Sequence, residues 1–106
     1  MDTYEIYIAY VSWTGGGKHR PVLVLEENAG NVTVFDITTQ YQNKSESIRA
    51  KYFLINDWKQ AGLDMQSYID TNSTITVSLS VVDSKNPIGK LSAADEERLI
   101  EFINQW

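Results

Sequence analysis

Apolar residues fall in short runs up to Val82, either alternating with polar residues or grouped with β-branched and aromatic ones. Runs of this kind, with no polar stripe every 3.6 residues, are typical of β-strands. They predict strands at residues 4–11, 21–27, 32–38, 47–55, 68–70 and 74–82. The polar stretches between them include 28–31, which favours a tight hairpin tolerant of left-handed geometry, and 71–73, which favours a turn.

The C-terminal segment has a helical period instead. One apolar stripe at i, i+3, i+4 and i+7 is formed by Leu99, Phe102, Ile103 and Trp106. Ser92, with Asp95 three residues later, forms a capping box, so a helix is predicted to begin there. A short second helix is predicted from a cap at Asn56 or Asp57 through Ala61, closed by Gly62 in left-handed geometry.

The order of these elements predicts the fold class. Several short strands and one terminal helix in 106 residues favour a mainly β domain, a compact antiparallel half-barrel or barrel, with residues 1–106 forming a single domain. A hydrophobic content of 42% is ordinary for such a domain.

The segment before the second predicted strand combines glycine with basic side chains. Gly15–Gly17 leave the backbone free to adopt φ > 0 and to approach a ligand closely, and the basic residues 18–20 follow directly. Pro21 fixes φ and biases Arg20 towards an extended conformation. We therefore expect residues 12–18 to form a binding loop that presents Arg20 at the mouth of a strand.

Charge and composition narrow the class of ligand. The net charge of −5 argues against indiscriminate nucleic-acid binding, because phosphate contacts need many Lys and Arg side chains. The basic residues gather locally, however, at 18–20 and again at Lys44, Arg49 and Lys51. A small cationic site on an acidic body favours a short, specific polyanion.

Several classes of site are not expected. The chain has no cysteine and one histidine, and its scattered carboxylates lack the spacing of a zinc site, so neither a metal nor another cofactor is predicted. The apolar runs are too short to cross a bilayer, and the acidic start does not resemble a secretory leader. We expect a cytoplasmic protein.

The remaining chemistry is a metal-free phosphate site built on Arg20. A guanidinium binds phosphate in a bidentate manner and can stabilise a pentacovalent intermediate if RNA is cleaved by its own 2′-hydroxyl. His19 is a candidate general acid or base, and Asp36 and Thr38 lie on one face of the strand 32–38. The alternatives are a surface salt bridge for Arg20, an exposed loop histidine, and a polar face of an exposed strand.

Three segments resemble the MazF/PemK family of toxin endoribonucleases. Residues 16–25 look like the family's glycine-rich loop ending in Arg-Pro and an apolar strand, residues 34–40 are similar to its strand ending in Ile-Thr, and residues 88–92 resemble the lead into its last helix. The resemblance implies an SH3-like β-barrel, a homodimer, metal-independent cleavage of single-stranded RNA, and neutralisation by an antitoxin peptide on the RNA-binding surface.

Carried over by position, the resemblance implies that Arg20 is the catalytic arginine and Thr38 the catalytic or phosphate-positioning threonine, while His19 or Asp36 handles a proton. It also implies RNA contacts by Gly16, Gly17, Lys18, Thr39, Gln40 and Lys44. Bases would stack on loop aromatics such as Trp13 and Tyr41.

One segment departs from the family pattern and keeps two other functions open. Residues 78–83, expected to form the penultimate strand, lack the arginine that many members carry there. A catalytically inactive binding or repressor module is therefore one alternative. The other is a non-enzymatic toxin that poisons a DNA topoisomerase, like the CcdB relatives of this fold. In those relatives the last few residues are the functional part, so Trp106 would carry the activity.

Overall fold

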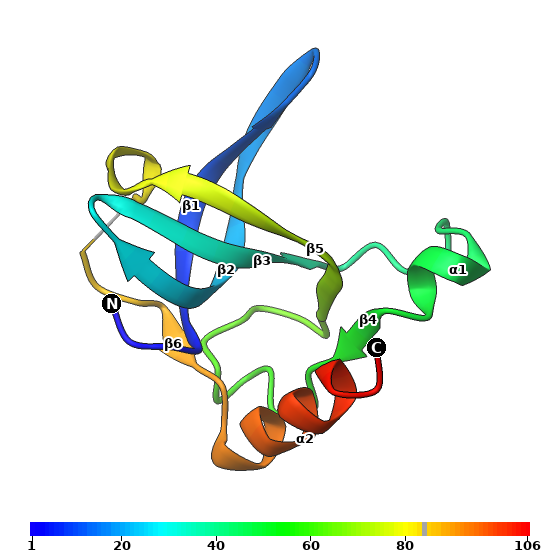
Figure 1. The fold of residues 1–106 in the computed structure, drawn as a ribbon. Coiled ribbons are helices and arrows are strands. Elements are labelled where there is room, and N and C mark those ends of the chain that lie inside the picture. The colour runs from blue at the N-terminus through cyan, green and yellow to red at the C-terminus, as the bar shows by residue number, and fades with distance from the viewer. Residues whose placement is uncertain (84) are drawn as a thin grey trace.

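A curled antiparallel sheet forms the centre of the computed structural model, which describes residues 1–83 and 85–106 (Figure 1). Its order is β4-β5-β3-β2-β1-β6, and the strands are β1 (Glu5–Trp13), β2 (Gly16–Asn28), β3 (Asn31–Thr38), β4 (Tyr52–Leu54), β5 (Tyr68–Ser78) and β6 (Gly89–Lys90). The helices are α1 (Glu46–Arg49), the 3₁₀ helix η1 (Leu79–Val81) and α2 (Ala93–Ile103). The expected mainly β fold, an SH3-like barrel with a C-terminal helix, is confirmed.

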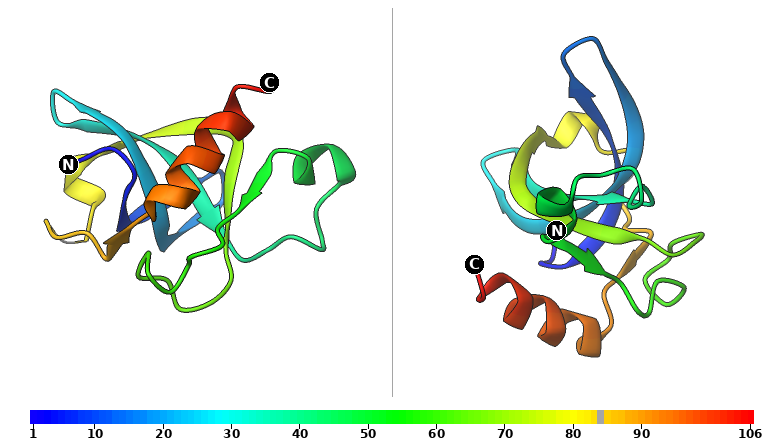
Figure 2. Two further views of the ribbon diagram at one scale, coloured as in Figure 1. Left: turned by 90° about the horizontal axis from the view of Figure 1, so that it is seen from below. Right: turned by 90° about the vertical axis from the view of Figure 1, so that its right-hand side faces the viewer.

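Both faces of the sheet are covered, because alternate residues of each strand point to opposite sides. One face packs against α2 through a cluster that includes Ile6, Leu23, Phe35, Phe53 and Leu99. The other face lies inside the curl and gathers a second cluster that includes Tyr7, Val22, Val34 and Val77. Figure 2 shows α2 lying along one side of the sheet, away from the long hairpin of β1 and β2.

The glycine-rich segment is a β-ribbon and not the predicted free loop. Ser12 pairs with Gly17 and Trp13 with Gly16, so the β1–β2 ladder runs almost to the tip of a hairpin that projects from the barrel (Figure 1). Gly15 has a φ of 88° in the turn. A Cβ on Gly17 would come within 2.6 Å of the Tyr10 hydroxyl, so this glycine makes room for the ring on the neighbouring strand.

Three predicted strands are corrected by the structure. The first half of the predicted strand 47–55 is α1, capped by Ser45, whose hydroxyl accepts a hydrogen bond from Ile48 N. The predicted strands 68–70 and 74–82 are mostly one strand, β5. Its pairing with β3 shifts between Val34 and Asp36, so the polar residues 71–73 form an irregularity within the strand instead of a turn.

The helix over residues 57–61 is also not formed as predicted. This segment is a series of turns, although Gly62 does take the left-handed φ, at 87°. The backbone N–H groups of Asn56 and Asp57 donate to the carboxylate of Asp95, at 3.4 and 2.8 Å. The turn is therefore anchored to the first turn of α2.

The predicted start of the C-terminal helix is confirmed. The Ser92 hydroxyl accepts a hydrogen bond from Asp95 N at 3.1 Å. The Asp95 side chain, only 1% exposed, does not complete the capping box but binds the 56–57 turn and Arg98 Nη1. Among the described residues, no helix has the length and apolar character needed to span a membrane.

Candidate functional site

A small hollow forms where β3 ends at Thr38 while β2 continues along the hairpin. The β2–β3 ladder reaches only as far as Val22 and Asp36, so the preceding residues of β2 have no strand beside them on that side. The hollow has a volume of about 150 Å³. Its wall includes most of the residues that the sequence singled out: Lys18, His19, Arg20, Thr38, Thr39 and Gln40.

Arg20 and Thr38 meet at this hollow because of strand register. Val22 pairs with Asp36, and the same register continued by two residues sets Arg20 opposite Thr38. Side chains two residues apart on a strand share a face, so both side chains point to one side of the sheet. A guanidinium and a hydroxyl are thereby brought to one opening from two different strands.

Asp36 lies beside Arg20. Arg20 Nε and Asp36 Oδ1 are 2.8 Å apart, yet the N–H does not point at this oxygen, and neither atom has a hydrogen-bond partner among the described residues. Burial raises the pKa of Asp36 to about 6; Arg20 opposes this rise and Asp70, the register partner of Asp36 on β5, adds to it. The carboxylate is thus close to an arginine that retains unused donors.

This raised pKa predicts a pH-dependent stability. Asp36 holds its proton in the folded state up to about pH 6, whereas an unfolded aspartate loses it near pH 4, so the free energy of unfolding should fall as the pH rises between these values. The loss corresponds to about 2–3 kcal/mol at neutral pH. Asp36→Asn stays uncharged, so it should gain that much over the unchanged chain between pH 4 and 7.5 in urea titrations. Parallel stability profiles for the two proteins would contradict this.

Thr38 is buried, and its hydroxyl is held in place. Thr38 Oγ1 accepts a hydrogen bond from Gln40 N at 3.0 Å, which ties the end of β3 to the following turn. An accepting hydroxyl still has its own hydrogen to donate. Thr38 can therefore donate to an anionic oxygen in the hollow while its position is fixed by the backbone.

His19 is oriented by a residue that sequence reasoning missed. Its Nδ1 lies 2.9 and 3.0 Å from the two carboxylate oxygens of Asp83, and its ring packs edge-on against Tyr10 at 5.2 Å. Nε2, the other ring nitrogen, has no partner among the described residues. No sequence signal joined Asp83 to His19, because the two meet only through the bridge of Ala9 with Val82.

Residues 78–83, which lack the arginine of the family pattern, do not form the expected strand. Residues 79–81 form η1 and not the expected penultimate strand. Ser78 Oγ accepts from Ser80 N, which turns the chain, and Asp83 N then donates to Ile8 O. The segment therefore supplies a carboxylate for His19 where the family pattern led us to look for an arginine.

Some predicted RNA-contacting residues do not line the hollow. Gly16 and Gly17 lie in the projecting hairpin, paired with Trp13 and Ser12. Lys44 lies beyond β3, where its N–H donates to Tyr41 O. These residues are not part of the wall around Arg20.

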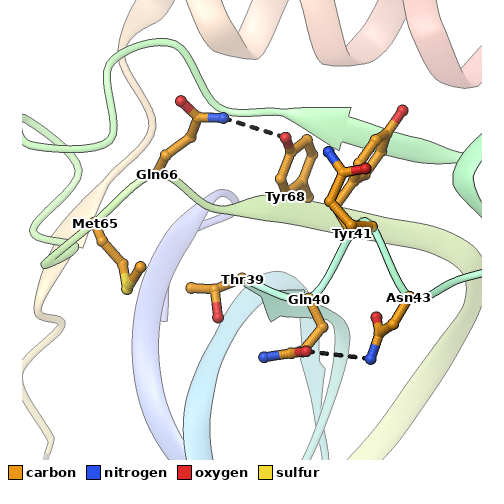
Figure 3. A pocket seen from close by; sticks show the side chains of 8 residues that line it. Thr39, Gln40, Tyr41, Asn43, Met65, Gln66 and Tyr68 are labelled. Carbon is orange, nitrogen blue, oxygen red and sulfur yellow. Dashed lines mark hydrogen bonds between the residues drawn. The ribbon is translucent and has the colours of Figure 1, made fainter.

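A second, larger pocket adjoins the hollow and shares Thr39 and Gln40 with it (Figure 3). Its volume is about 430 Å³. Tyr41 and Tyr68 form part of its wall, with their rings stacked at 4.5 Å and 15°. Tyr41 was foreseen as a stacking residue, whereas Asn43, Gln66 and Tyr68 were missed because polar loop residues carry no distinctive pattern.

Metal ligands do not converge in the part of the chain that the structure describes. Residues 1–83 and 85–106 contain no group of three or more His, Asp or Glu side chains that could hold a metal ion. The side chains that do converge on the hollow are cationic, hydroxyl and amide groups, which suit an anion.

Comparison with known proteins gives one consistent result. Residues 2–106 match the family model described as PemK-like, MazF-like toxin of type II toxin-antitoxin system. The solved structure of Mycobacterium tuberculosis toxin MazF-mt6 is similar, with 28% identity and a TM-score of 0.71 over 95% of this chain and 93% of that one. A second, titled as an Mtb toxin, has 28% identity and a TM-score of 0.61 over 81% and 90%. No curated protein matches.

Proposed function

Because this chain belongs to the PemK-like, MazF-like toxins of type II toxin–antitoxin systems, we propose that it is an endoribonuclease that cleaves single-stranded RNA without a metal ion. The observation that carries the proposal is the convergence of Arg20 and Thr38 on one hollow, with Lys18 beside them. Because toxins of this family belong to type II toxin–antitoxin systems, an antitoxin is the expected partner.

The proposed reaction is an internal transfer at phosphorus. The 2′-oxygen of a ribose attacks the adjacent phosphorus, the bond from phosphorus to the 5′-oxygen breaks, and the products carry a 2′,3′-cyclic phosphate and a 5′-hydroxyl. The proton leaves the 2′-hydroxyl for a base, and the departing 5′-oxygen takes up a proton. Nothing is oxidised or reduced, so no cofactor is needed.

Arg20 supplies the electrostatic part of this reaction. Its Nε lies 2.8 Å from Asp36 Oδ1, and its terminal nitrogens bond to no described residue, which leaves them for the phosphate. Two parallel donors match two phosphate oxygens, and they bind the pentacovalent intermediate more strongly than the substrate because its charge is higher. Asp36 acts as a positioning residue in this scheme.

Thr38 and a proton-exchanging group supply the remaining roles. The Thr38 hydroxyl, fixed by Gln40 N, donates to the phosphate and holds the scissile bond in place. The group that exchanges protons with the sugar oxygens is His19 or Asp36: His19 borders the hollow with its ring turned toward Tyr10 and Asp83, and Asp36 lies beside Arg20. Asp83 keeps the imidazole in that orientation.

The proposal is tested by incubating the purified protein with mixed-sequence single-stranded RNA in the presence of a chelator. We expect discrete fragments, and duplex RNA of the same sequence should be cut far more slowly because its 2′-hydroxyl cannot reach an in-line geometry. RNA that stays intact while the protein still arrests growth would favour the topoisomerase-poison alternative. Intact RNA without growth arrest would favour an inactive binding module.

The alternative based on Trp106 has less structural support. Its ring is 58% exposed, but it packs edge-on against Phe102 at 5.9 Å, with the Lys51 ammonium 5.0 Å from its centre. These contacts extend the apolar stripe of α2. The expected homodimer is part of the proposal as well, and the oligomeric state of the purified protein is the measurement for it.

A further inference from the structure

The pocket that adjoins the Arg20 hollow, which we call the amide pocket, has a composition of its own. It is lined by Thr39, Gln40, Tyr41, Gln42, Asn43, Met65, Gln66 and Tyr68. None of these side chains carries a charge at neutral pH, in contrast to the hollow with Lys18 and Arg20 next to it. A phosphate is therefore not the group that the amide pocket would bind.

We propose that the amide pocket holds the nucleobase next to the scissile phosphate, and that Gln66 is a residue that determines sequence preference. This inference rests on the proposed function. The volume of about 430 Å³ lies within the range of small-molecule sites. Bases of single-stranded RNA are recognised by stacking on aromatic rings and by hydrogen bonds from polar side chains to their edges, and this pocket contains both kinds of group.

Two hydrogen bonds within the amide pocket orient three exposed amide groups and leave one end of each of these groups without a partner among the described residues. Gln66 Nε2 donates to the Tyr68 hydroxyl at 3.2 Å, and Asn43 Nδ2 donates to Gln40 Oε1 at 3.3 Å (Figure 3). The opposite ends, Gln66 Oε1, Asn43 Oδ1 and Gln40 Nε2, bond to no described residue. The amide pocket thus offers both acceptors and donors, as the edge of a base requires.

The aromatic wall is made of rings that contact one another. Tyr41 is stacked on Tyr68, and both rings lie near Tyr52, at 6.2 and 6.4 Å. The guanidinium of Arg49 lies 5.5 Å from the centre of Tyr41. An aromatic group fixed by its neighbours loses little freedom when a base packs against it, so this wall suits selective binding.

The amide pocket lies next to the proposed site of RNA cleavage. Thr39 and Gln40 border both the amide pocket and the hollow, and Thr38, which precedes them, donates to the phosphate in the proposed reaction. A nucleotide whose phosphate lies at Arg20 therefore has the amide pocket within reach of its base. The base beside the cut is the occupant that this arrangement favours.

The test uses the full chain and a random-sequence single-stranded RNA library, with the cut sites read by sequencing. Gln66→Ala should lower the preference at one position beside the cut roughly tenfold, as expected for a lost base contact. The matched control is Gln60→Ala, which removes an exposed amide from the 56–62 turn. It should keep the original preference.

The outcomes separate the two proposals. If the unchanged protein leaves the library intact, the endoribonuclease proposal fails, and the base site fails with it. If the unchanged protein cuts selectively and Gln66→Ala cuts with the same preference, only the assignment of the amide pocket is overturned. Loss of preference in Gln60→Ala as well would also overturn it, because the effect would then not be local.

Discussion

Arg20→Ala is expected to lower kcat/KM for RNA cleavage about 10³-fold, because it removes the donors aimed at the charge that develops on phosphorus. Arg20→Lys should recover little of this activity, since an ammonium cannot bind two phosphate oxygens with two parallel donors. The measurement is single-turnover cleavage of one RNA oligonucleotide by each variant. The fold should survive, because Asp36, left without the arginine, can take up a proton.

Lys59→Ala is the matched control for Arg20. It removes one positive charge from an exposed position in the 56–62 turn, which the structure separates from the hollow. Its cleavage rate should stay close to that of the unchanged protein. Equal rates for Arg20→Ala and Lys59→Ala would show that the guanidinium has no part in the reaction.

Asp95→Ala is expected to lower the free energy of unfolding by about 3 kcal/mol, the largest effect we predict on stability. The substitution removes the acceptor for two backbone N–H groups of the 56–57 turn and for Arg98, at a site that is 1% exposed. The 56–62 turn would then lose its attachment to α2. Urea unfolding followed by circular dichroism measures the change.

Glu97→Ala serves as the comparison for Asp95. It removes a carboxylate from the same helix at an exposed position, so its effect should stay within about 0.5 kcal/mol. A loss of stability in Asp95→Ala no greater than that in Glu97→Ala would mean that the buried carboxylate does not anchor the turn.

The strands of the barrel could be predicted because their sequence pattern matches their burial. Residues 32–38 alternate between two apolar clusters on opposite faces of the sheet, and the same alternation correctly put Asp36 and Thr38 on one side. The helix α2 was equally clear, since its cap and its apolar stripe agree. Local pattern and tertiary packing favour the same structure in these elements.

The errors arose where tertiary contacts outweighed local preference. The glycines of residues 15–17 suggested a free loop, but pairing along the hairpin and the Tyr10 ring above Gly17 account for them. Residues 71–73 resemble a turn. The strand pairing of residues 68–70 and 75–78 nevertheless makes them part of one continuous strand, β5. A single sequence does not show which strand will lie alongside.

The candidate site was predictable in part for the same reason. Arg20 and Thr38 were named from residue type and from the family resemblance, and strand register brings them to one hollow. Asp83 and Gln66 were not foreseen, because Asp83 meets His19 from a distant part of the sequence and Gln66 lies in an irregular loop. Such pairs become visible only when the fold is known.

The central claim is that RNA is cut by its own 2′-hydroxyl at Arg20 and Thr38. The most direct measurement compares a single-stranded RNA oligonucleotide with the same molecule carrying one 2′-deoxy nucleotide on the 5′ side of the cut, with product ends identified by mass spectrometry. We predict that the RNA yields a 2′,3′-cyclic phosphate and a 5′-hydroxyl and that the deoxy position is not cut. Cleavage at the deoxy position, or a 5′-phosphate on the product, would contradict the proposed mechanism.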